Sequence, residues 1–277
     1  MLTRHRGSGR LDGHFVALTL PVDNPLRRLA LAHGGATLDY APTVPGRFAT
    51  LSAAGLLPAM LAGLDAQAVR TGASMVFETA IAEPDSAPLG GAAALIGLAL
   101  EQGRSHHVML VYGGALSDFA GWHRVLTAEC LARNGRGITP MRALGPRDQH
   151  GQMQLWLDGP PAKHFTVITV AEGGAGAPLP MMPDGDPELH ALAGHSLNNV
   201  VQTQARATIE TLAGHGVPTR LIRLNRLDEK SMGGLIMHFM LETVIAADLI
   251  GVNAFDQPAV EEGKILAREY LAKGGRV

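Results

Sequence analysis

Short apolar runs rich in Val, Ile and Leu alternate with much longer segments of helical periodicity along this chain. Four such runs are HFVALTL at 14–20, HHVMLVYG at 106–113, HFTVITV at 164–170 and TRLIRL at 219–224. Most of them are followed by Gly, Pro or Asp, which end a strand. Strands that alternate with helices pack as a parallel sheet with helices on both faces. The alternation therefore predicts an α/β fold, a parallel sheet sandwiched by helices.

Several helix ends can be read from the sequence. In VDNPLRRLALAHGG, Asp23 or Asn24 can cap a helix whose first residue is Pro25, and Gly34 suits the position just after its end. Helical periodicity also predicts helices over three further segments. These are 116–133, which ends near Asn134–Gly135, 195–216, which Ser196 can cap, and 231–252, whose apolar residues lie almost all round and indicate burial.

Composition bounds the kind of protein. The chain has 277 residues, of which 46% are hydrophobic and 17% charged, enough for one large domain or two small ones. A formal net charge of −2 does not favour a nucleic-acid or anionic membrane surface. The apolar run at 90–100 is too short to span a bilayer. One cysteine, Cys130, excludes an internal disulfide, and we expect a cytoplasmic protein.

The strand pattern also indicates a division of the chain. Residues 1–104 hold one clear strand followed by helices, whereas residues 105–277 hold three strands and their helices. A lone strand cannot form a sheet, so we expect 15–20 either to join the later sheet or to be the last strand of a domain whose beginning is missing. The Gly/Pro-rich stretch 171–188 is expected to be a long loop.

Metal and cofactor motifs are weak. The pairs His106–His107 and His190/His195 do not have the spacing of a metal site, and no HExxH or paired CxxC occurs. The glycine-rich GGAGA lacks the strand-to-helix context of a dinucleotide site. RTGASMVFET at 70–79 resembles a phosphate cradle, but it lies inside an expected helix, so core packing is favoured. We therefore expect neither metal nor organic cofactor.

Four polar segments are less ordinary. VPGRF at 44–48 places Arg47 just before a helix, so that its guanidinium can project from a helix N-terminus. Glu129 falls in the last turns of a helix, and His150 falls in a Gly/Pro-framed turn with Asp148 and Gln149. NAFDQPAVEEGK at 253–264 spaces Gln257 and Lys264 seven residues apart. Taken singly, each has an ordinary alternative: a surface charge, a solvated carboxylate, a capping or core histidine, an exposed lysine.

Taken together, these segments resemble the glucose-6-phosphate isomerase family. NAFDQPAVEEGK matches the family signature FDQxxVExGK at every fixed position, and residues 128–160 are similar to the region of the catalytic glutamate and histidine. GRF and the following LSAAGLLPAMLAGLD look like the family's GGRYS-type segment and its helix. The likeness runs from about residue 20 to the C-terminus. It implies a sugar-isomerase (SIS-type) fold.

The resemblance also implies roles for five residues. Glu129 matches the base that moves a proton between C2 and C1 of the sugar, and Arg47 matches the guanidinium that stabilises the enediolate. His150, reaching across a homodimer interface, and Lys264 match the residues that open the ring. Gln257 matches a substrate-contacting glutamine. The implied reaction is the interconversion of glucose 6-phosphate and fructose 6-phosphate through a cis-enediol, with a phosphosugar substrate and no cofactor.

The sequence departs from the family pattern in two places. Pro45 stands where the family usually has glycine. Proline fixes φ, so the loop that carries Arg47 is expected to sit slightly differently. The family's glycine-rich and Ser/Thr-rich phosphate loops have no counterpart, so we expect residues 1–104 to be the remnant of a first sugar-isomerase domain plus connecting helices. Residues 105–277 would then be the second such domain with C-terminal helices. The alternative function is a non-catalytic remnant, or a phosphosugar-binding module that pairs with a complete isomerase subunit.

Overall fold

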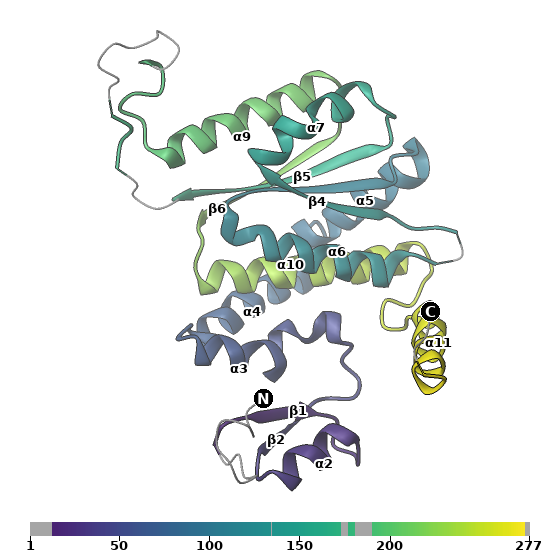
Figure 1. The fold of residues 1–277 in the computed structure, drawn as a ribbon. Helices are drawn as coiled ribbons and strands as arrows, with labels where there is room; N and C mark the ends of the chain where they lie inside the picture. The colour runs from purple at the N-terminus through teal and green to yellow at the C-terminus, as the bar shows by residue number, and fades with distance from the viewer. Residues whose placement is uncertain (1–12, 134, 173–176, 181–189, 275–277) are drawn as a thin grey trace.

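The computed structural model describes residues 13–133, 135–172, 177–180 and 190–274 (Figure 1). Its main sheet has four parallel strands in the order β4-β3-β5-β6. The strands are β3 (His106–Tyr112), β4 (Thr139–Gly145), β5 (Lys163–Glu172) and β6 (Thr219–Arg226). The helices are α2 (Pro25–Ala32), α3 (Ala53–Leu61), α4 (Ala66–Ala82), α5 (Ala87–Gln102), α6 (Ser117–Leu131), α7 (Arg147–Asp158), α9 (Leu197–Gly214), α10 (Glu229–Leu249) and α11 (Glu261–Ala272). The predicted α/β class is confirmed.

The two central strands form the middle layer of the core. Residues 107–112 of β3 and 163–170 of β5 are all buried, which explains why Val, Ile, Leu, Met and Phe predominate in their centres. Strand β4 was not predicted, because its sequence TPMRALG mixes Pro140 and Arg142 among its apolar residues. It lies at the edge of the sheet, where a strand tolerates a proline.

Helices cover the sheet on both faces, as Figure 1 shows. On one face, α5, α6 and α10 pack with Met109 and Val111 of β3 in the larger core cluster. On the other face, α7 and α9 pack with Val108 and Leu110 in the second cluster. Alternate residues of one strand therefore belong to different cores, as the pleat requires.

Among the helices in the described ranges, α10 is the longest. It is the one helix there that is long and apolar enough to cross a membrane, and half of that apolar stretch is buried inside the fold. It packs against α4, α5 and α6. This packing accounts for the all-round apolar pattern that predicted its burial.

Helices α4 and α10 touch backbone to backbone. A Cβ added at Gly72 of α4 would lie 1.8 Å from the carbonyl oxygen of Lys230, and one added at Gly233 of α10 would lie 1.8 Å from that of Val69. Both distances are far inside van der Waals contact. Only glycine fits at either crossing position.

The N-terminal part forms a separate small unit (Figure 1). Strand β1 (Val16–Thr19) pairs in parallel with β2 (Ala36–Asp39), with α2 between them in the chain. The expectation that 15–20 might join the main sheet was wrong, because β2 is its partner. Strand β2 was not predicted, since ATLD is short and ends in aspartate.

Most of the predicted helix ends are confirmed. The Asn24 side chain accepts from the Arg27 N–H, and Ser196 caps α9 through the Asn199 N–H. Gly34 has φ +70°, as its position after α2 requires. The segment 70–79 lies within α4, as predicted. Most of the expected loop at 171–188 falls outside the described residues, and the division near residue 104 stays a prediction.

Candidate functional site

Arg47 is carried by η1 (Gly46–Leu51), a short 3₁₀ helix that follows Pro45. The expectation that its guanidinium projects from a helix N-terminus was wrong. The side chain instead turns into the protein, and 1% of it is exposed. The indole N–H of Trp122 on α6 donates to the Arg47 carbonyl oxygen at 3.0 Å, which fixes η1 against α6.

The buried guanidinium of Arg47 joins two distant parts of the chain. Its Nη1 donates to Glu129 Oε2 at 3.2 Å, and its Nε lies 3.1 Å from Cys130 Sγ. Its Nη2 donates to the carbonyl oxygens of Ala254 and Asp256, at 2.6 and 3.2 Å. These charge-assisted hydrogen bonds hold the Arg47 guanidinium in one position.

Glu129 stands near the C-terminal end of α6, as predicted, although α6 ends at Leu131 rather than at residues 134–135. About a third of its side chain, 34%, is exposed. The carboxylate is therefore paired with a buried cation on one side and open to solvent on the other. A small molecule can therefore reach the Glu129 carboxylate without any movement of the protein.

The segment 253–257 closes over Arg47. The Asn253 side chain accepts from the Phe255 N–H at 2.9 Å and shapes the turn. The ring of Phe255 lies 5.2 Å from that of Phe48, centroid to centroid, next to Arg47 in η1. Gln257 is half-buried at the end of this segment, before η3 (Pro258–Val260).

Arg133 is a second arginine that contacts the 253–257 segment. Its guanidinium donates to the Asp256 carbonyl oxygen and, at 3.1 Å, to the Asp256 carboxylate. The carbonyl of Asp256 thus accepts from Arg133 and Arg47 together. Sequence reasoning missed the roles of Cys130, which follows Glu129 in α6, and of Arg133, which lies two residues beyond the end of that helix.

Lys264 lies on α11, the helix that follows this segment. Its side chain is 58% exposed and forms an ion pair with Glu261 at 2.8 Å. Among the described residues it contacts neither Glu129 nor Arg47. Arg47, Glu129 and Cys130 form the cluster at this site. The structure places Lys264 on an adjoining helix and does not bring it into this cluster.

His150 lies elsewhere. The expected turn at 148–150 is in fact the start of α7, which covers the face of the sheet opposite α6. Gln149 is held there by the hydroxyls of Tyr112 and Thr208, the latter at 2.9 Å. His150 itself is exposed. Within one chain, the structure does not bring His150 to Glu129.

The electrostatics of the cluster leave Cys130 neutral. Burial raises the pKa of its thiol, and the hydrogen bond from Arg47 opposes this only in part. The cluster thus offers one fixed positive charge and one accessible carboxylate, which can accept and return a proton next to a developing negative charge. No group of three or more His, Cys, Asp or Glu residues suited to a metal ion occurs in the described ranges.

The fold is that of an α/β protein with a parallel sheet between helices, and its candidate site pairs a buried guanidinium with an accessible carboxylate. The sequence is 36% identical over 266 residues to glucose-6-phosphate isomerase of Rubrobacter xylanophilus, over 94% of this chain. A solved hypothetical protein of Thermus thermophilus is 35% identical over 98% of this chain and 66% of that one, with a TM-score of 0.90. The chain belongs to the glucose-6-phosphate isomerase family.

A solved glucose-6-phosphate isomerase of Chlamydia trachomatis shares the fold. It is 17% identical and has a TM-score of 0.72, over 100% of this chain and 56% of that one. No family model matches the sequence. The chain spans 60% of the length of the Rubrobacter relative.

Proposed function

We propose that this protein interconverts glucose 6-phosphate and fructose 6-phosphate through a cis-enediol. The observation that carries the proposal is the pair formed by Arg47 and Glu129. A carboxylate with 34% of its side chain exposed stands 3.2 Å from a guanidinium with 1% exposed. Isomerisation needs these two groups, a base that moves one proton and a fixed cation beside the enediolate oxygen.

The steps follow from this arrangement. Glu129 takes the proton from C2 of the open-chain aldose and returns it to C1, and the electron pair moves from the C–H bond into the enediolate. Arg47 stabilises the oxygen on which the negative charge develops. Gln257 contacts the sugar, because the turn at 253–257 is held against Arg47 and faces the same region.

Ring opening is assigned to Lys264 and His150. Lys264 belongs to the helix that follows the 253–257 turn. His150 lies on the opposite face of the sheet from α6, so we propose that it acts at the site of a second copy in a cytoplasmic homodimer. A twofold interface would supply one histidine to each site.

The activity is tested by incubating fructose 6-phosphate with the purified protein in D₂O. Turnover to glucose 6-phosphate with deuterium at C2 is expected for the wild type and should be lost in Glu129→Gln. Glu210→Gln is the control, since Glu210 is another exposed glutamate paired with an arginine. A folded wild type that binds fructose 6-phosphate without turnover would instead support the phosphosugar-binding module.

The shared site is tested by mixing two inactive variants, Glu129→Gln and His150→Ala, under conditions that exchange subunits. If His150 crosses to a second copy, each mixed dimer contains one intact site. About a quarter of wild-type activity should then return at equal mixing. No recovery, with subunit exchange shown by mass labelling, would overturn the proposed sharing.

A further inference from the structure

Two arginine–glutamate pairs in the described ranges have a partner whose side chain is only 1% exposed, and they use the carboxylate differently. Glu242 accepts from Arg220 through both of its oxygens, at 2.6 and 3.0 Å, and also contacts His238 at 3.2 Å. Glu129 accepts from Arg47 through Oε2. The Glu242 carboxylate is therefore fully engaged in the interior, whereas that of Glu129 keeps an oxygen available at the candidate site.

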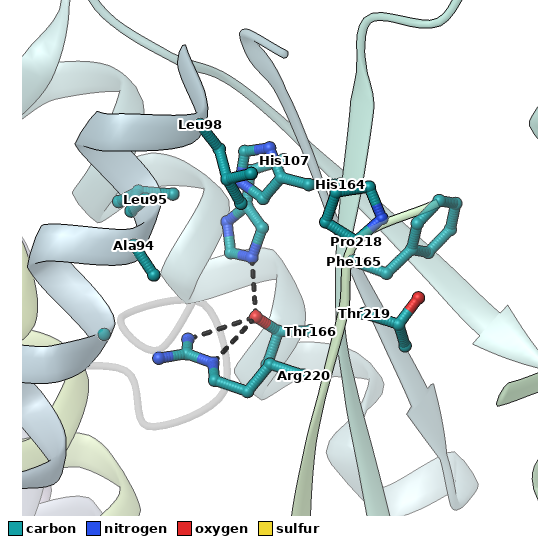
Figure 2. Close-up of a pocket in the computed structure, with 11 residues that line it drawn as sticks. Ala94, Leu95, Leu98, His107, His164, Phe165, Thr166, Pro218, Thr219 and Arg220 are labelled. Carbon is teal, nitrogen blue, oxygen red and sulfur yellow. Dashed lines mark hydrogen bonds between the residues drawn. The ribbon is translucent and has the colours of Figure 1, made fainter. Parts of the chain in front are cut away.

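Both arginines have a neutral acceptor beside Nε. Figure 2 shows that Nε and Nη2 of Arg220 donate to the Thr166 hydroxyl oxygen, at 3.3 and 3.0 Å. Nε of Arg47 donates to Sγ of Cys130 at 3.1 Å, and Cys130 is fully buried. Burial raises the pKa of the Cys130 thiol, so the sulfur accepts as a neutral group. The two sites thus share one arrangement, a neutral side chain that holds the arginine at Nε.

The contact with Cys130 limits how the Arg47 guanidinium can move. Nη1 and Nη2 are held by Glu129 and by the carbonyl oxygens of Ala254 and Asp256. A planar group held at two atoms can still tilt about the line that joins them, and the contact at the third nitrogen, Nε, prevents this tilt. Four of the five N–H groups of a guanidinium are then used. The fifth is on Nη1, the nitrogen that also donates to Glu129.

We propose that Cys130 is a positioning residue for the isomerisation and acts through Arg47. Its sulfur holds the plane of the guanidinium so that the unused N–H of Nη1 stays beside Glu129, where the enediolate forms. The acceptor has to be neutral, because a second anion next to the guanidinium would draw its positive charge away from the enediolate oxygen. This role rests on the proposed function, but the orientation of Arg47 can be measured without turnover.

The kinetic test compares Cys130→Ala, which removes the acceptor, with Cys130→Ser, which replaces it by another neutral one. With fructose 6-phosphate as substrate, kcat of Cys130→Ala should fall at least about tenfold while KM stays within about twofold of the wild-type value. Cys130→Ser should keep kcat within about threefold of the wild type. Thr166→Val is the matched control, because it removes the neutral acceptor from Nε of Arg220, outside the site. It should lower stability and leave kcat unchanged.

The orientation of the guanidinium is measured from the Arg47 Nε–H signal in a nitrogen–proton NMR spectrum, assigned by its loss in Arg47→Met. Hydrogen exchange of this Nε–H should be slow in the wild type and in Cys130→Ser. In Cys130→Ala it should be at least about tenfold faster, because the donor has lost its acceptor. If the alanine variant does not fold, Cys130→Val takes its place, since it fills the space of the thiol without an acceptor.

Wild-type kcat in Cys130→Ala, or an equal loss of kcat in the alanine and serine variants, would overturn the positioning role. An Arg47 Nε–H that exchanges at the same rate in the wild type and in Cys130→Ala would also overturn it. A wild type without turnover would instead contradict the proposed function, and the exchange rates would still decide whether Cys130 holds Arg47 in position.

Discussion

Arg47 Nη1 lies 3.2 Å from Glu129 Oε2 although the two residues are 82 positions apart in sequence. Their burial is unequal, because the arginine side chain is 1% exposed and the glutamate side chain 34%. The cation is therefore a fixed part of the interior, whereas the carboxylate faces the outside. This inequality supports the proposed roles, a fixed cation at Arg47 and a proton-transferring carboxylate at Glu129.

Removing the Arg47 guanidinium should destabilise the protein as well as inactivate it. In Arg47→Met, the carbonyl oxygens of Ala254 and Asp256 lose their Arg47 donors, and a buried acceptor left unpaired costs roughly 1–3 kcal/mol. Urea unfolding should show a lower free energy of unfolding. Arg70→Met is the control, since Arg70 is exposed and makes one long contact, 3.4 Å to the Leu51 carbonyl oxygen. Equal stability of the two variants would contradict the prediction.

Arg133 should hold the 253–257 turn in place with little effect on global stability. Its ion pair with Asp256 is partly exposed, and such pairs contribute about 0–1 kcal/mol. Arg133→Gln is expected to speed hydrogen exchange of the backbone amides at 255–257 while the melting temperature stays close to that of the wild type. Arg136→Gln, an exposed neighbour, should leave exchange there unchanged. Unaltered exchange in Arg133→Gln would show that Arg47 alone holds the turn.

Glycine at the α4–α10 crossing should tolerate no side chain. Gly72→Ala brings a Cβ to 1.8 Å from the Lys230 carbonyl oxygen, so the helices must separate and the core must open. Gly97→Ala on α5 meets nothing within 4 Å and should stabilise by up to about 1 kcal/mol through helix propensity. Thermal unfolding of the two variants should therefore shift in opposite directions. A Gly72→Ala protein as stable as the wild type would sink the prediction.

Stability should fall as the pH drops from about 6.5 towards about 4. Burial lowers the pKa of His123 and of His164 to about 4, so the unfolded chain takes up protons on both in this range while the folded protein does not. Their contribution is complete above 6.5 and is lost as the pH falls to about 4. Unfolding by urea at several pH values measures this slope, which should flatten in His164→Gln. A slope identical to that of the wild type would contradict the assignment.

Glu242 makes the stability of the protein depend on pH in a second, more acidic range. Burial alone would raise its pKa, but the hydrogen bond from His238 and the Arg220 guanidinium lower it to about 2. Its stabilising effect is present above the ordinary value near 4.5 and is lost as the pH falls from there to about 2. The two losses should appear as separate ranges in an acid titration of stability followed by near-ultraviolet circular dichroism. Glu242→Gln should abolish the lower one.

The fold could be predicted where one physical signal dominates. Strands β3 and β5 are buried on both faces, so Val, Ile, Leu, Met and Phe predominate in their central residues, and both strands were identified. Strands β2 and β4 were missed because they are short or lie at an edge, and Asp39, Pro140 and Arg142 blur their pattern. Their existence depends on pairing with a distant strand, which local sequence does not encode.

The site was predictable only as a set of residue types. The motifs brought Arg47, Glu129 and Gln257 to attention, but the depth at which Arg47 is buried depends on η1, α6 and the 253–257 turn meeting in space. His150 was expected in a turn, and the structure places it in α7, on the other face of the sheet. The contacts of Arg133 with Asp256 span 123 positions and have no local signature.

The glycine crossing between α4 and α10 has a mechanical consequence. Helix α3 joins η1, which carries Arg47, to α4, and α10 ends four residues before the turn at 253–257, whose carbonyl oxygens accept from Arg47. Two backbones that touch without intervening side chains have no rotamers to rearrange, so the helices can neither slide nor rotate past one another at low cost. The crossing therefore fixes the spacing between α4 and α10, and we expect movement at the site to involve its exposed parts, the carboxylate of Glu129 and helix α11.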